Sequence, residues 1–266
     1  MNVPLVDCHM HTTYSDGHTS IEENVSAAIA AGCSLIACTD HLARPEIMDY
    51  AIEETRIDAY VADIKQARRK HPEIEIVYGF ECDWYADCEA DIAQTKGGAT
   101  FLLGSVHYLD EYPIDWQKDL RIWEIMSPEQ VWQRYVDDWA KACFSSAKFD
   151  SMAHPDLVKL FSQNKRALST GAAPFYNQMA EAAQQAGVRI EINTSARRKG
   201  LGEFYPGHEL LEAFCKAGVP ITVGSDAHHA SEVGYGIRDA YALAYEVGYR
   251  SIDVPRADGS FSSFEL

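Results

Sequence analysis

Histidine and acidic or amide residues recur in this sequence directly after short apolar runs. Six of the ten histidines hold such positions. Neutral imidazole and carboxylate groups are ligands for zinc, manganese and iron in proteins. Metal ligation is therefore the simplest chemistry that the set predicts. Its members are His9, His11, Asp40, His41, Glu81, His107, His154, Glu191, Asn193, Asp226 and His228.

The first pair, His9 and His11, has the spacing H-x-H. Side chains two residues apart on a strand project to the same side, so both rings can bind one ion. Asp7 precedes them and is the expected acceptor for a ring N–H. The alternative for Asp7 is a strand-end carboxylate in water.

The acids of the set also favour bound cations. Without bound cations, the carboxylates of Asp16, Glu81 and Asp226 would repel one another in a partly buried site. Asp16 lies outside the strand ends, and His18 beside it is an alternative ligand. The dipeptide His154-Pro155, taken alone, would be read as structural.

The elements that must position these residues alternate between short apolar runs and helical patterns. This rhythm predicts a parallel α/β fold, and in α/β barrels the carboxyl ends of the strands converge on one face, where active sites lie. Residues far apart in sequence should therefore meet there. The predicted strands are residues 3–7, 35–39, 74–80, 100–106, 149–153, 188–193 and 220–224.

Helix boundaries are marked by capping residues. Ser20 and Glu23 form a capping box, and Gly32 ends the same helix. Ser127-Pro128 opens a long helix with proline at its first position, and its aromatic residues are expected in the core. Residues 110–127 form the longest irregular insertion, within which 120–124 could be ordered. The other predicted helices are residues 58–70, 174–187, 208–217 and 237–246.

Composition narrows the class of protein. The 266 residues fit one barrel domain over 1–266, and a net charge of −17 argues against nucleic acid or a membrane as partner. A small anionic substrate stays possible because metals reverse the local field. Seven cysteines without a C-x-x-C pair, and no visible signal peptide or membrane helix, predict a cytoplasmic protein. No nucleotide-binding or serine-nucleophile motif is visible.

In order along residues 7–228, the motifs resemble those of the PHP (polymerase and histidinol phosphatase) family. That resemblance implies a distorted (β/α)7 barrel, in agreement with the seven strand–helix units, and a cluster of up to three metal ions. The motifs are His9-Met10-His11-Thr12 with Ser15-Asp16-Gly17, Thr39-Asp40-His41, Gly79-Phe80-Glu81, Ser105-Val106-His107, Ala153-His154-Pro155 and Ser225-Asp226-Ala227-His228.

Carried over by position, the resemblance implies how the ligands are shared among zinc, manganese or iron ions. The first metal would be bound by His9, His11, Glu81 and Asp226. A second would share Glu81 and take His107 and His154. A third would take Asp16, His41 and His228.

The segment from Glu191 to Gly200, followed by Tyr205-Pro206, resembles the histidinol-phosphate phosphatase branch, which commonly has glycine where Ala196 stands. By this resemblance Arg198 would hold the substrate phosphate through forked contacts. Lys159 would be a second cation there. Two further arginines, Arg197 and Arg166, are reserve candidates.

The implied reaction is hydrolysis of L-histidinol phosphate in histidine biosynthesis, by in-line attack of a metal-activated water. Asp226 or His228 would protonate the leaving oxygen. The amine and the imidazole of this substrate would need acidic or polar partners, which Asp110, Glu111 or Asp115 could supply. The alternatives are a PHP phosphoesterase for nucleotides or another small phosphate ester, and a non-enzymatic metal-binding barrel. The oligomeric state does not follow from the sequence.

Overall fold

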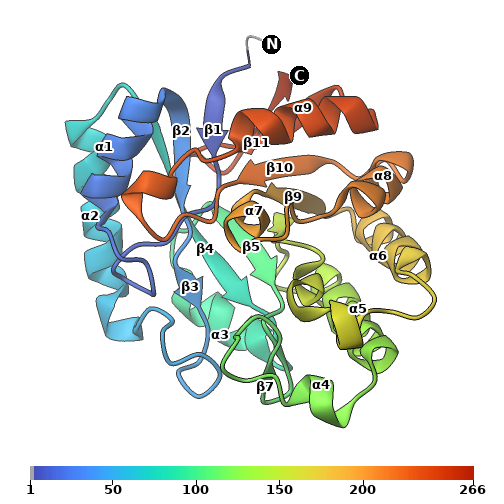
Figure 1. Ribbon diagram of the computed structural model, residues 1–266. Coiled ribbons are helices and arrows are strands. Elements are labelled where there is room, and N and C mark those ends of the chain that lie inside the picture. Colours follow the sequence, from blue (N-terminus) through green and yellow to red (C-terminus); the bar gives the residue numbers. More distant parts are fainter. Residues whose placement is uncertain (1–2) are drawn as a thin grey trace.

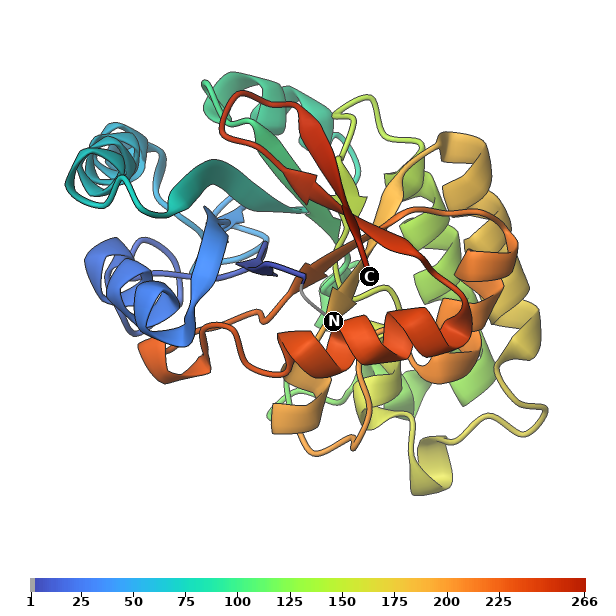
Figure 2. The same ribbon diagram turned by 90° about the horizontal axis from the view of Figure 1, so that it is seen from above.

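Seven parallel strands form a curved, nearly closed sheet in a computed structural model that describes residues 3–266 (Figures 1 and 2). The backbone N–H of Cys8 donates to the carbonyl of Val223 at 3.0 Å, so the last strand of the sheet returns to the first. The predicted distorted (β/α)7 barrel is thereby confirmed. In sheet order the strands are β1 (Leu5–Asp7), β2 (Cys33–Cys38), β4 (Glu75–Asp83), β5 (Phe101–Ser105), β8 (Ser151–Met152), β9 (Arg189–Asn193) and β10 (Ile221–Gly224).

Helices surround this sheet, and their ends follow the capping signals. Ser20 accepts from the N–H of Glu23 in a capping box, and Gly32 ends that helix with a left-handed φ of 82°. Ser127 forms the same box with Gln130. The longer helices are α1 (Ile21–Ala31), α2 (Ile57–Lys70), α3 (Cys88–Thr95), α5 (Pro128–Cys143), α6 (Ala173–Ala186), α8 (His208–Lys216) and α9 (Ile237–Val247).

The inner faces of the helices bury their apolar side chains against the sheet. Trp132, Tyr135 and Trp139 of α5 are buried, as their helical spacing predicts. Removing an aromatic side chain of this kind from a core typically costs about 3–5 kcal/mol. Because the strand side chains are held by this core, the strand ends are a rigid base for polar groups. No helix among residues 3–266 is long and apolar enough to cross a membrane.

One strand extends further than the sequence predicts. Strand β4 continues past residue 80 to Asp83, because the short strand β3 (His41–Leu42) pairs with it in parallel. In that register His41 lies opposite Glu81. The predicted strand-end acid therefore lies inside the sheet, with Asp83 as a second acid at the true end.

The insertion and the carboxyl-terminal segment contain structure that the sequence analysis left out. A small hairpin, β6 (Tyr108–Leu109) and β7 (Tyr112–Pro113), precedes α4 (Ile122–Ile125), so the order expected near 120–124 is present. The last residues form an antiparallel hairpin, β11 (Ser251–Pro255) and β12 (Phe261–Glu265). Its turn contacts Glu75, the first residue of β4, so it lies at the amino end of the barrel, opposite the predicted site (Figure 2).

Candidate metal centre

The carboxyl ends of the strands bring all nine predicted metal ligands into adjoining groups. Nitrogen and oxygen atoms within each group lie within 4.8 Å of one another. Three of the groups contain the predicted ligands alone, and a fourth combines two of the histidines with Asp83. The groups are His11, Asp16, His41 and His228; His9, His11 and Asp226; Glu81, His107 and His154; and His41, Asp83 and His107.

Glu81 is the acid at the middle of these groups. Its carboxylate is almost fully buried, and its Oε1 lies 2.8 Å from the Nε2 of His154 and 3.7 Å from that of His107. The other oxygen, Oε2, lies 3.1 Å from the Nε2 of His9 and 3.3 Å from that of His11. The two oxygens therefore face different groups, as a carboxylate shared by two metals requires.

The H-x-H pair behaves as its spacing predicts. The Nε2 atoms of His9 and His11 point to the same place and lie 3.1 Å apart. Asp226 adds its Oδ1 at 3.3 Å from the Nε2 of His11 and 3.8 Å from that of His9. All three side chains are buried.

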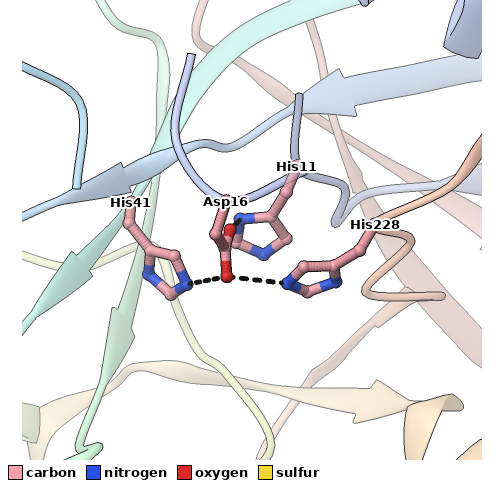
Figure 3. A group of neighbouring side chains, drawn as sticks. All are labelled: His11, Asp16, His41 and His228. Carbon is pink, nitrogen blue, oxygen red and sulfur yellow. Dashed lines mark hydrogen bonds and ion pairs between the residues drawn. The ribbon is translucent and has the colours of Figure 1, made fainter. Parts of the chain in front are cut away.

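A more open group forms around Asp16 (Figure 3). The Oδ2 atom of Asp16 lies 3.2 Å from the Nε2 of His228 and 3.8 Å from that of His41. The Nδ1 of His11 approaches the other oxygen at 3.4 Å. His18, the alternative ligand, lies outside this group and stacks on the exposed ring of His229 at 4.3 Å between centroids.

Asp40 has a structural role at this rim. Its Oδ1 accepts hydrogen bonds from the backbone N–H groups of Thr12 and Ser15, and both hydroxyls donate to it. These bonds hold the loop that carries Asp16. Asp40 itself belongs to none of the donor groups.

The donor chemistry fits transition-metal ions. Two buried imidazole nitrogens that face each other at 3.1 Å beside carboxylates are an arrangement that a cation stabilises. The Nδ1 of His11, which faces Asp16 at 3.4 Å, is buried and has no hydrogen-bond partner among residues 3–266. Buried polar atoms are normally paired, so this one is consistent with a ligand that completes the site.

The pKa shifts of the buried side chains also indicate that positive charge stabilises this site. Burial alone would raise the pKa of Glu81, but His9, His41 and His107 hold it well below its usual range. Burial alone would lower the pKa of His107, yet Asp83 and Glu81 raise it to about 10. In the absence of metal, protons on histidine therefore supply the positive charge that the buried carboxylates need.

The acceptor behind His9 is a different acid from the one predicted. Asp7 was expected to bind a ring N–H, but it accepts from the backbone and hydroxyl of Ser225 and from the N–H of Gly234. Glu191 takes that role, with its Oε1 2.8 Å from the Nδ1 of His9. The expectation was wrong because residues next to a ligand in sequence can face a neighbouring segment of chain.

Two of the predicted metal ligands have unusual backbone conformations. His154 has a φ of 27° and Asp226 a φ of 55°, in the region that favours glycine. Each lies two residues after the end of a strand, β8 or β10, where the chain turns across the mouth of the barrel. Such conformations cost on the order of 1–3 kcal/mol and cluster at functional sites.

The predicted cations occupy different surroundings. Arg198 donates from Nη2 to the carbonyl of Asp226 at 2.7 Å, and its buried Nη1 has no partner within the described chain. Lys159 is buried between Asp156, at 2.9 Å, and Glu203, at 3.1 Å. Lys199, which the sequence analysis did not select, places its Nζ 3.8 Å from Asp226 Oδ2.

Neither reserve arginine has a side-chain hydrogen bond or ion pair to a predicted metal ligand among residues 3–266. Arg197 pairs with Asp239 at 2.7 Å and covers the ring of Phe204. Arg166 ends a 3-10 turn, Asn164–Arg166. Of the predicted arginines, Arg198 is the one that contacts a metal-ligand residue in the described structure.

Comparison with known proteins agrees with this geometry. The PHP domain pattern matches residues 7–195, which is most of the chain. The chain belongs to the PHP domain family. The match begins at the strand that carries the H-x-H pair and ends after Glu191, so it covers most of the ligand-bearing strand ends of this PHP domain.

Several relatives of this PHP domain are similar to it over nearly their whole length. A protein described as a probable histidinol-phosphatase from Deinococcus radiodurans is 28% identical over 93% of this chain and 95% of its own. The histidinol-phosphatase of Bacillus subtilis is 24% identical over 86% and 95%. A crystal structure of histidinol phosphate phosphatase from Lactococcus lactis, complexed with zinc, L-histidinol and phosphate, has a TM-score of 0.82 at 21% identity, covering 97% and 98%. At that identity the likeness establishes the fold.

Proposed function

We propose that this protein hydrolyses L-histidinol phosphate to L-histidinol and inorganic phosphate. The observation that carries the proposal is the set of adjoining donor groups at the mouth of the barrel, with Glu81 between the His9–His11 pair and His154. Histidinol-phosphatases are the named relatives that match the chain almost end to end. Together they support a metal-dependent phosphomonoesterase that acts in histidine biosynthesis.

The proposed metal complement is three ions of zinc, manganese or iron. One is held by His9, His11, Glu81 and Asp226, a second by Glu81, His107 and His154, and a third by Asp16, His41 and His228. The donor groups support this division, and His11 borders both the first and the third. When bound, such metals supply Lewis-acid charge and lower the pKa of water toward about 7.

Arg198 is the proposed phosphate-binding residue. Its Nη2 is used by the carbonyl of Asp226, and the unpaired Nη1 remains to bind a phosphoryl oxygen. A guanidinium suits this task because its N–H groups form a fixed fork. For Lys159 to act as a second cation, it would have to leave Asp156 and Glu203, so its role stays a prediction.

A cavity of about 630 Å³ beside Asp16 suits the leaving group. Asp115, one of the three acids considered for this role, lines it, whereas Asp110 pairs with Arg134 at 2.9 Å. Acids and aromatic rings attract an ammonium or imidazolium group and repel a polyphosphate. The lining therefore favours L-histidinol phosphate over a nucleotide. Its side chains include Asp16, Glu46, Asp49, Tyr50, Tyr108, Asp115 and Trp116.

Asp226 and His228 are the proposed candidates for protonating the leaving oxygen. Their side chains lie 3.6 Å apart, from Oδ1 to Nδ1, at the edge of the Asp16 group. Ser195 donates its hydroxyl to the second oxygen of Asp226 at 2.9 Å. This bond fixes the carboxylate so that its Oδ1 faces the histidines.

The net charge and the cysteines support two further proposals, a small substrate and a cytoplasmic location. A net charge of −17 favours a small substrate over nucleic acid, because the molecule repels phosphate backbones at long range. All seven cysteines are free, which agrees with a cytoplasmic location where thiols stay reduced.

The test of this function is a phosphate-release screen with zinc, manganese or iron supplied. We expect kcat/KM for L-histidinol phosphate to exceed that for nucleoside and sugar phosphates. Asp115→Asn should lower kcat/KM for the cationic substrate and leave hydrolysis of phenyl phosphate, which has no cation, nearly unchanged. If a nucleotide is preferred by orders of magnitude, L-histidinol phosphate is not the substrate, and the protein is instead a PHP phosphoesterase that acts on nucleotides.

A further inference from the structure

Asp83 contacts two of the proposed metal ligands at once. It is the last residue of β4 and is almost fully buried. Its Oδ1 is hydrogen-bonded to the Nδ1 of His107, and its Oδ2 lies 3.2 Å from the Nδ1 of His41. A single carboxylate therefore spans two histidines that come from different segments, β3 and the loop after β5.

The opposite nitrogens of these rings face two different metal-ligand groups. The Nε2 of His41 points to Asp16 at 3.8 Å, within the group drawn in Figure 3. The Nε2 of His107 points to Glu81 at 3.7 Å, in the group completed by His154. Both rings thus place Nδ1 on Asp83 and Nε2 toward a metal position, and the Nδ1 of His41 also lies 3.4 Å from the Oε2 of Glu81.

This arrangement determines the tautomer of each ring. A neutral imidazole has one N–H, and an ionised carboxylate can only accept hydrogen bonds. Asp83 therefore retains the proton on Nδ1 of each ring, so that the Nε2 lone pair is the one that a metal can use. A ligating histidine normally needs such a partner, which fixes its orientation and increases its basicity.

We infer that Asp83 is a positioning residue that holds His41 and His107 in the metal-binding tautomer and so links two of the three metal positions. The inference rests on the metal ligands of the proposed function, but it does not depend on the identity of the substrate. Asp83 is predicted to determine how tightly the second and third metals bind.

A direct metal ligand is the other role that the same atoms permit, because His41, Asp83 and His107 also form a donor group of their own. An ion there would need the Nδ1 lone pairs of both rings. Each ring would then have to bridge two cations and lose its last proton. The two hydrogen bonds to one carboxylate favour the positioning role.

An amide in place of this carboxylate gives a selective test. In Asp83→Asn the new side chain could accept from one Nδ1–H, but its NH2 group would face the other ring. That ring would have to accept through Nδ1 and carry its proton on Nε2, where it could not bind metal. We expect the variant to bind zinc at one or both linked positions about 10- to 100-fold more weakly.

Zinc titration of the metal-free protein, with elemental analysis, measures this change without any substrate. Asp150→Asn is the matched control. Asp150 directly precedes β8 at the amino end of the barrel, away from the metal ligands, and its carboxylate accepts a hydrogen bond from the backbone N–H of Leu102. Its zinc stoichiometry should equal that of the unaltered protein. Unchanged stoichiometry and affinity in Asp83→Asn would overturn the inference.

Nitrogen-15 NMR of the zinc-loaded, unaltered protein gives a second test that does not depend on a variant folding. His41 and His107 should each show a protonated Nδ1 and a zinc-bound Nε2. Zinc bound to Nδ1 of either ring would overturn the inference and identify Asp83 as a ligand. A failed substrate screen with these NMR signals intact would refute the proposed substrate alone.

Discussion

His9 and Glu191 are 182 positions apart in the sequence and meet at the mouth of the barrel, where Nδ1 of the ring lies 2.8 Å from Oε1 of the acid. The second oxygen of Glu191 accepts from the N–H of His154 and from the side-chain amide of Asn193. Glu191 therefore ties one metal-ligand ring to the backbone of another.

Glu191→Gln should weaken metal binding. A glutamine amide has one acceptor oxygen, so its NH2 group must face either His9 or the two donors on the other side. We expect metal affinity to fall about 10- to 100-fold, measured by chelator competition. Glu181→Gln, at an exposed acid whose side chain accepts from Gln185 alone within residues 3–266, is the control and should behave like the unaltered protein. Equal affinities in the two variants would contradict the role of Glu191.

Glu81→Ala should lose bound metal as well as activity. Both oxygens of Glu81 face histidine groups, so its removal leaves two positions without a ligand. The loss of activity should exceed the roughly 10- to 100-fold typical of an outer partner. Elemental analysis should find at least one metal equivalent fewer than in Glu73→Ala, a change on the exposed surface. Full metal content with full turnover would show that Glu81 does not bridge metals.

Gly224→Ala should disturb the site through packing. A Cβ at this position would lie 2.2 Å from the Oε1 of Glu191 and 2.4 Å from the Cβ of His9. Overpacking of this kind typically costs about 1–3 kcal/mol, and it should also displace His9 and weaken metal binding. Gly98→Ala is the matched control, since a Cβ there meets nothing within 4 Å. Thermal unfolding with and without zinc would separate the two effects.

Arg198→Ala should lower kcat/KM without changing metal content, because a guanidinium does not bind metals. A charge-assisted hydrogen bond contributes about 1.5–3 kcal/mol, which corresponds to about ten- to a hundredfold in rate. Arg197→Ala removes a neighbouring cation that pairs with Asp239 and should change kcat/KM little. If Arg197→Ala proves the more damaging change, the reserve assignment is the right one.

Metal binding should release protons and strengthen as the pH rises. Burial lowers the pKa of His107, but Asp83 and Glu81 outweigh it and raise the pKa to about 10. Below that pH the metal-free ring is protonated, so a metal must displace a proton. Calorimetry near neutral pH in two buffers of different ionisation enthalpy should detect this release. Affinity that stays the same from mildly acidic to mildly alkaline pH would count against it.

The strand ends could be predicted because each apolar run is followed directly by a polar residue. His107 and His154 lie in one site for this reason, although β5 and β8 are far apart in sequence. The roles of Asp83 and Glu191 could not be predicted, since they depend on which distant ring each acid faces. The spacing of Glu81 and Asp83, which repeats that of His9 and His11, was the available signal.

The carboxyl-terminal hairpin was also predictable in part. Residues 251–254 alternate between polar and apolar side chains, and Ala257-Asp258-Gly259-Ser260 has turn composition. The packing of the hairpin could not be predicted, because Phe261 contacts Arg189 and Phe101 at the amino end of the barrel. Such contacts depend on the closed sheet, which local patterns do not describe.

The left-handed backbone of His154 and Asp226 sets a limit on engineering a more heat-resistant form of this protein. Glycine would relax either position by about 1 kcal/mol or more, since it adopts positive φ without strain. A selection for thermal tolerance alone, run with excess chelator, would therefore tend to recover glycine there. Each such variant would gain melting temperature and lose a ligand, so stability and turnover must be selected together in this barrel.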